Sequence, residues 1–274
     1  MHRRHHFRTI VLSMLLVTAC TDSGTPQFAE PDPAAIQSNN RAVGLMGRFE
    51  YEQARDQFEA LVEQWPGWNE VRVNLAIATL NRQGDGDEAR ALQIVRDVLE
   101  EDPGHLRARY VAGLVQLYLG EPGAAQEAFR AVAEADPDDA FAAYYLAQCS
   151  AQLGDYENAL PQFRRALELN PYLRSAYYGA FQSLQRLGRQ DEASALAADY
   201  QRLEGNPRSQ LAEFKYTRMG PRGSALAVNT GSEGEAPAAP LQGALFSQAS
   251  AVIIETDSPV EWAEPSAQRP TSLT

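Results

Sequence analysis

Residues 120–137 read GEPGAAQEAFRAVAEADP and residues 154–171 read GDYENALPQFRRALELNP, and the two segments align without a gap. Each begins with a glycine, followed five residues later by an alanine, then after four by a phenylalanine, and after eight more by a proline. The alanine and the phenylalanine lie on one face of a helix, and the proline cannot continue that helix. The spacing predicts a repeated unit built on short helices.

The pattern recurs along the chain, with lead alanines separated by 37, 34, 34 and 34 residues. A glycine permits the positive φ that ends one helix, and an alanine lets the second helix approach closely. The larger apolar residue fills the gap between successive helix pairs. The five copies carry Ala54-Phe58-Pro66, Ala91-Val95-Pro103, Ala125-Phe129-Pro137, Ala159-Phe163-Pro171 and the weaker Ala193-Ala197-Gly205.

This set of residues resembles the tetratricopeptide repeat, whose signature is W-x2-L-G-x2-Y, then A-x3-F, then P. The first half of the signature is weaker, since Ala143, Leu146, Ala147 and Ser150 hold those places in the fourth copy. The resemblance implies an all-α helix-turn-helix solenoid that binds other proteins and is not an enzyme. We expect it over residues 35–219, with about five repeats and a capping helix over Ser209–Met219.

The chain begins with a basic stretch, MHRRHHFR, and an apolar stretch, Thr9–Ala19, that is too short to span a bilayer. Val17-Thr18-Ala19-Cys20 resembles the lipobox of bacterial lipoproteins, in which the cysteine is acylated. This predicts a signal peptide over 1–19, a lipid anchor on Cys20 and a tether over 20–34. By the same resemblance, Thr21 favours the outer membrane and its periplasmic face. The alternative is an ordinary signal peptide that ends at a chance cysteine.

Residues 220–274 have a different composition, rich in Gly, Ala, Pro and Ser in the first part, which predicts a mostly disordered tail. The stretch FKYTRMGP at 214–221 resembles the lead-in to a calcium-binding FG-GAP/VCBS propeller that follows tetratricopeptide repeats in some bacterial proteins. No propeller blade follows in the sequence. A truncated propeller protein and an ordinary disordered tail therefore remain as alternatives.

Composition argues against several classes of function. The chain has 36 Asp and Glu against 24 Lys and Arg, and this acidity disfavours nucleic acid as a partner. His105 is the one histidine outside the leader, so a multi-histidine zinc site is excluded, and we expect His105 to lie at the surface or cap a helix. Cys149 is expected to be a buried, inert thiol, and Asp87 a helix cap and not a calcium ligand. We expect no cofactor, metal or catalytic set.

A binding groove is predicted along the first helices of the repeats, because these line the concave side of stacked helix pairs. Tyr110, Tyr144 and Tyr178 recur there at the repeat period, and tyrosine is enriched in binding hot spots. The alternative is that these tyrosines pack between repeats. The predicted groove lacks lysine and asparagine, unlike the carboxylate-clamp subset. The expected binding residues are Tyr110, Tyr118, Phe141, Tyr144, Gln148, Gln152, Tyr178, Gln182 and Arg186.

Together these features predict a membrane-tethered scaffold that binds a segment of an envelope protein whose identity the sequence does not give. Assembly of the envelope is the expected setting. Two alternatives stay open. The solenoid could self-associate through exposed helices, or it could be the adaptor portion of a truncated protein with tetratricopeptide and FG-GAP parts.

Overall fold

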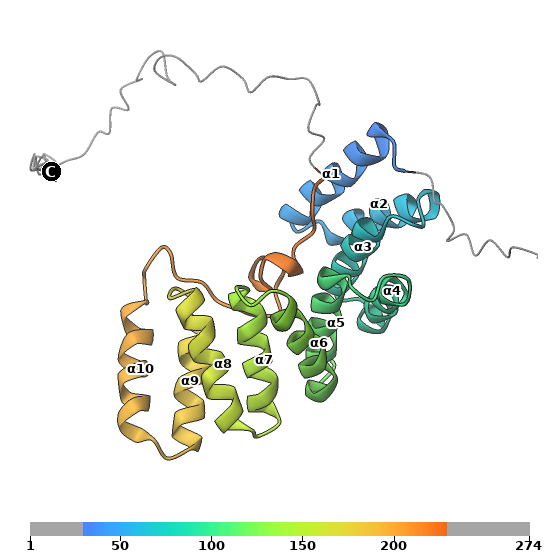
Figure 1. The fold of residues 1–274 in the computed structure, drawn as a ribbon. Coiled ribbons are helices and arrows are strands. Elements are labelled where there is room, and N and C mark those ends of the chain that lie inside the picture. Colours follow the sequence, from blue (N-terminus) through green and yellow to red (C-terminus); the bar gives the residue numbers. More distant parts are fainter. Residues whose placement is uncertain (1–29, 229–274) are drawn as a thin grey trace, which may run out of the picture. The chain divides into compact units, whose positions relative to one another are not determined.

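The computed structural model describes residues 30–228, which form ten α-helices stacked as five antiparallel pairs (Figure 1). Each helix packs on the one before it along the stack. The predicted all-α helix-turn-helix solenoid is confirmed. The pairs are α1 (Pro33–Gly47) with α2 (Tyr51–Gln64), α3 (Asn69–Arg82) with α4 (Asp87–Glu101), α5 (Leu106–Tyr118) with α6 (Pro122–Ala135), α7 (Ala140–Gln152) with α8 (Tyr156–Leu169), and α9 (Arg174–Arg186) with α10 (Gln190–Arg202).

The repeated residues take the places that their chemistry predicts. The glycine of each later copy has a φ between 72° and 81°, so it ends the turn between the two helices of a pair. All five lead alanines are fully buried, as are Phe58, Phe129 and Phe163. The Phe129 ring stacks on Tyr145 of the next pair, with 5.1 Å between the ring centroids. The aromatic residue therefore joins neighbouring pairs, as the spacing predicts.

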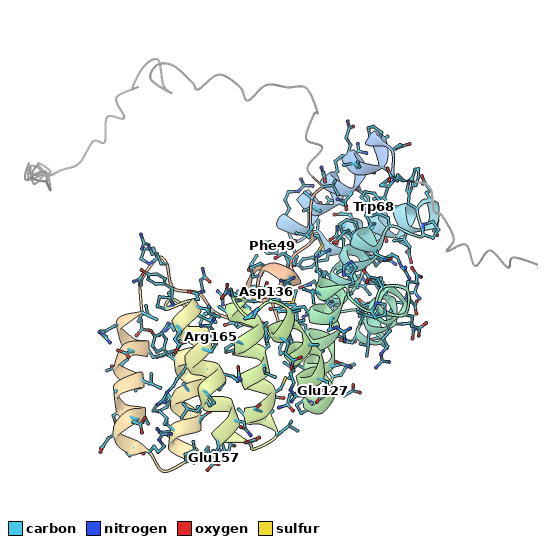
Figure 2. The ribbon with its side chains drawn as sticks, viewed as in Figure 1. Phe49, Trp68, Glu127, Asp136, Glu157 and Arg165 are labelled. Carbon is cyan, nitrogen blue, oxygen red and sulfur yellow. The ribbon has the colours of Figure 1, made fainter. Side chains whose placement is uncertain are left out.

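Phe49 occupies the position where the first copy lacks the glycine, five residues before Ala54 (Figure 2). Its φ is 64°, in the left-handed region, and its side chain is 54% exposed. Burial of the side chain therefore does little to offset the strain of this backbone conformation. A side chain in that region costs about 1–2 kcal/mol. Phe49 also makes an edge contact with Tyr51, at 6.1 Å between ring centroids, which offsets a small part of that cost.

We therefore expect Phe49→Gly to raise the free energy of unfolding by about 1 kcal/mol, since glycine adopts positive φ without strain. Urea denaturation followed by circular dichroism measures the change. The matched control is Gly154→Ala, at the equivalent turn with a φ of 81°, which should lower the free energy of unfolding by a similar amount. An unchanged or lower stability of Phe49→Gly would contradict the strain argument.

The residues after α10 differ from the sequence prediction. The capping helix expected over Ser209–Met219 is wrong, because that stretch holds only the 3-10 turn η1 (Tyr216–Arg218). Its backbone is bonded elsewhere: Gln210 N donates to Tyr172 O and Arg174 N donates to Gln210 O, both at 2.8 Å. These bonds place the segment beside the start of α9 and leave no room for a helical ladder at Gln210.

Residues 220–228 also have a defined conformation, including the 3-10 turn η2 (Pro221–Gly223), where composition predicts disorder. The signal peptide, Cys20, most of the tether and residues 229–274 lie outside the described residues. The predicted lipid anchor therefore stays a prediction, as does the alternative of a truncated propeller.

Candidate protein-binding groove

One continuous segment lies across the first helices of all five pairs. We call residues 209–228 the strap; Figure 1 shows it in orange, passing from α9 to α1. At one end, Ala212 N donates to Ser175 Oγ of α9 at 3.0 Å. At the other end, Val228 N donates to Asn40 Oδ1 of α1 at 2.8 Å. The strap therefore occupies the face on which the groove was predicted.

The middle of the strap packs on an aromatic floor. Tyr110 is fully buried, and its hydroxyl donates to Met219 O at 2.6 Å. Gly220 has a φ of 85°, and a Cβ added there would lie 2.6 Å from Tyr110 Oη and 2.8 Å from Phe141. At Gly223 an added Cβ would lie 2.7 Å from Met219 Cβ. The floor thus requires bare backbone at Gly220, whereas the close contact at Gly223 is made within the strap itself.

The end of the strap is held by polar side chains that bond its backbone. Arg107 Nη2 donates to Ser224 O at 2.9 Å, and a second nitrogen of Arg107 donates to Glu70 at 2.7 Å. Asn74 accepts from Leu226 N at 2.9 Å and donates to Leu226 O at 3.0 Å. Asn40 makes the same two bonds to Val228, both at 2.8 Å. Two asparagines on neighbouring first helices therefore bond alternate residues of an extended chain in the same way.

Charge adds a further contact at the start of α7. Arg222 Nε donates to Asp139 Oδ2 at 2.8 Å, and the guanidinium also pairs with Asp136, which Figure 2 labels beside the strap. Asp139 caps α7 through its other oxygen, which accepts from Phe141 N and Ala142 N. The strap arginine therefore meets two carboxylates, one at the end of α6 and one at the start of α7.

The strap contacts three of the predicted binding residues. Tyr110 and Phe141 lie under it, and Tyr118, which is 43% exposed, makes an edge contact with Phe214 at 5.8 Å between ring centroids. Tyr144 is buried against Tyr145 and Phe163, so its ring packs between repeats. Burial raises the pKa of Tyr144 to about 12.

The remaining predicted residues lie together on α7 and α9, beside the strap. Gln148, Gln152, Gln182 and Arg186 line a hollow of about 320 Å³. Tyr178 is 49% exposed next to it, and its hydroxyl accepts from Gln182 Nε2 at 3.0 Å. We call this hollow the open site. The groove thus has a half covered by the strap and a half that the strap leaves uncovered.

Three asparagines that bond the strap were not among the predicted groove residues. The statement that the groove lacks asparagine is wrong, because Asn39, Asn40 and Asn74 face the strap from α1 and α3. A signal was present: Asn40 precedes Ala54 by 14 residues, and Asn74 precedes Ala91 by 17. The three-residue insertion in the turn after α3 accounts for the difference. The two therefore occupy equivalent positions.

The described residues hold the candidate reactive groups in structural roles. His105 caps α5, accepting from Ala108 N at 3.2 Å. Cys149 is fully buried, which raises the pKa of its thiol to about 12 and keeps it protonated. Asp87 does not cap α4 as predicted; it pairs with Arg82 and accepts from Gly84 N at 2.7 Å. Over residues 30–228, no group of three or more His, Cys, Asp or Glu is placed to bind a metal.

None of the helices within residues 30–228 combines the length and apolar character needed to cross a membrane. The family model for the tetratricopeptide repeat matches residues 39–105 and 110–173. The chain carries a tetratricopeptide repeat array. Tetratricopeptide arrays bind other proteins, and this chain is a non-catalytic repeat protein of that kind.

Solved structures with a similar fold share low sequence identity with this tetratricopeptide array. MamA 41-end from Desulfovibrio magneticus RS-1 is 23% identical with a TM-score of 0.58, over 65% of this chain and 99% of that chain. A double mutant, MamA RS-1 ArsTM, is 23% identical with a TM-score of 0.57, over 64% and 96%. MamA AMB-1 is 21% identical with a TM-score of 0.55, over 61% and 98%. These values show a common fold. No curated protein matches the chain.

Proposed function

We propose that this protein is a scaffold of the bacterial envelope, anchored by a lipid on Cys20, that binds an extended segment of another envelope protein. The observation that carries the proposal is the open site. It is a hollow lined by residues of α7, α8 and α9, and no residue of the strap lines it.

The side chains of the open site suit a polypeptide backbone. A glutamine amide both donates and accepts, so Gln148, Gln152 and Gln182 can each bond the N–H or C=O groups of an extended chain. Arg186 adds a positive charge to the lining, which favours a partner segment with an acidic side chain. The exposed Tyr178 adds apolar area with a hydroxyl at its end, which is typical of a binding hot spot.

The membrane tether rests on the leader sequence. A basic start, a short apolar stretch and the small residues before Cys20 agree with one another, and Thr21 favours outer-membrane retention. Two or three acyl chains hold a protein firmly, since each buried methylene contributes about 0.8 kcal/mol. A partner in the same membrane or in the periplasm would then be within reach of the array.

The test is cross-linked capture by the full chain in membrane fractions, followed by identification of the retained proteins. The variant Gln182→Ala/Arg186→Glu removes an amide and reverses the charge of the open site, so we expect at least a tenfold loss of the specific partner. Arg96→Glu, on the exposed side of α4, is the matched charge-reversal control and should retain it. In the same preparation, Cys20→Ser should move the chain from the membrane to the soluble fraction.

Retention of one and the same set of proteins by all variants would refute partner binding at the open site. If the cross-linked product is instead a second copy of the chain, the self-associating solenoid becomes the better description. A Cys20→Ser variant that stays in the membrane fraction would remove the lipid anchor from the proposal and leave the open site untouched. The truncated-propeller alternative rests on the stretch at 214–221 and the tail after it, and this test does not depend on it.

A further inference from the structure

We propose that the covered half of the groove, over α1, α3, α5 and the start of α7, is a sequence-selective peptide site and that strap residues 219–228 are its resident ligand. An external segment enters this site by displacing the strap. It must carry the same chemistry, a glycine followed by proline, arginine and glycine, and then an extended run. This inference concerns the covered half and is independent of the open site.

The floor of this half is built to hold a polypeptide. Asn74 is fully buried and Arg107 is 6% exposed, yet each directs part of its hydrogen-bonding capacity at the strap backbone. Without an occupant, these groups would lose their bonds to the strap and would bond water instead. The hydroxyl of fully buried Tyr110 also depends on the strap for its bond, since it donates to Met219 O. Three side chains of the floor are therefore bonded to the backbone of the bound chain.

The contacts also select for sequence. Only glycine fits at position 220, because the Cβ of any other residue would lie less than 3 Å from Tyr110 and Phe141. Arg222 forms ion pairs with two carboxylates, those of Asp136 and Asp139. Met219 is 1% exposed and fills the apolar part of the floor beside Gly223. Ala225 is also buried, whereas Leu226 and Val228 are held through their backbone, so the site is selective at 219–223 and 225 and tolerant at 226–228.

The strap is joined covalently to the array, so it competes with any added peptide for the site. Residues 203–208 join it to α10, and a short linker of this kind gives an effective concentration of about 1 mM. A free peptide of equal affinity added at about 10 µM would then fill roughly 1% of the sites. The unmodified chain should therefore bind little added peptide, because its strap fills the site. A chain with a weakened strap should bind more.

The experiment uses the full chain and a fluorescent peptide with the sequence of residues 209–228. The chain variant Arg222→Glu places a carboxylate against Asp136 and Asp139, which weakens the strap without altering the groove. Fluorescence anisotropy should show that Arg222→Glu binds the native peptide at least tenfold more tightly than the unmodified chain does. A peptide that itself carries Arg222→Glu should not bind either chain.

Arg218→Glu is the matched control, since Arg218 lies in the same strap but pairs with Glu213 of the strap itself. It should bind the peptide no better than the unmodified chain. Circular dichroism establishes that each variant is folded. If Arg222→Glu loses helix, Gly220→Ala serves as the strap-weakened chain in the same assay.

Two results would overturn the inference. Equal and tight binding of the native peptide by the unmodified and the strap-weakened chains would show that the strap does not occupy the groove. No binding by any folded strap-weakened chain would show that the groove is not a peptide site. Adding Gln182→Ala/Arg186→Glu to the strap-weakened chain should leave peptide binding unchanged, so failure here and failure of the open site are distinguishable.

Discussion

Phe129→Ala is expected to lower the free energy of unfolding by about 4 kcal/mol, within the range of about 3–5 kcal/mol for a buried phenylalanine. The ring is fully buried between Tyr110 and Tyr145, at centroid distances of 5.3 and 5.1 Å. The neighbouring wall cannot collapse into the cavity, because Gly113 faces the ring with no side chain. The loss should therefore include both the transfer term and the cavity term.

Urea denaturation followed by circular dichroism measures this loss. Tyr118→Ala is the control, since this 43% exposed ring makes only an edge contact with Phe214 and should cost about 1 kcal/mol or less. Because Phe129 joins the third pair to the fourth, its removal should also broaden the transition as the two parts of the array unfold more independently. A loss below about 1.5 kcal/mol would show that the interface between these pairs repacks.

Gly220→Ala is expected to release the strap. The φ of 85° and ψ of 167° at Gly220 lie in a region that essentially only glycine populates, at a cost of about 1–3 kcal/mol for other residues. The added methyl would also lie 2.6 Å from Tyr110 Oη, and Tyr110 is fixed within the core. Together these should cost about 3 kcal/mol, which corresponds to more than a hundredfold shift towards the released strap.

Hydrogen exchange measures this release directly, because the amides of Leu226 and Val228 are protected by their hydrogen bonds to Asn74 and Asn40 alone. Their exchange should become at least a hundredfold faster in Gly220→Ala, while amides inside α7 keep their protection. Gly205→Ala is the matched control: its φ is 75°, but an added Cβ meets nothing within 4 Å. Equal protection in the two variants would mean that the floor does not select glycine at position 220.

The sequence predicts the helix pairs because their identities are local. The glycine, alanine, phenylalanine and proline of each copy act within about 18 residues, and each has one steric reason for its place. The same local reading fails after α10. Leu211, Phe214 and Met219 have a spacing that suits a helix. Backbone groups of this segment instead bond residues far away in the sequence, such as Tyr110, which is 109 residues from Met219.

The groove could be predicted only in part for a related reason. On α5, α7 and α9 the repeat signature is clear: Tyr110 and Phe141 contact the strap and Gln182 lines the open site, but Tyr144 packs between repeats. That these residues bind a partner stays a prediction. On α1 and α3 the copies have diverged, and Asn40 and Asn74 were not placed. The repeat spacing could not predict that the strap occupies the groove, because the strap belongs to no repeat.

The strap also changes how the array can come apart. A stack in which each pair touches only its neighbours loses its end pairs first, one at a time. Here Val228 is bonded to Asn40 across 188 residues of sequence, and Gln210 is bonded to the start of α9. The first and last pairs are thus joined through one backbone, so opening either end strains contacts at the other. Because the partners of the strap lie on α1, α3, α5, α7 and α9, we expect the strap to dock late in folding, after these helices have formed.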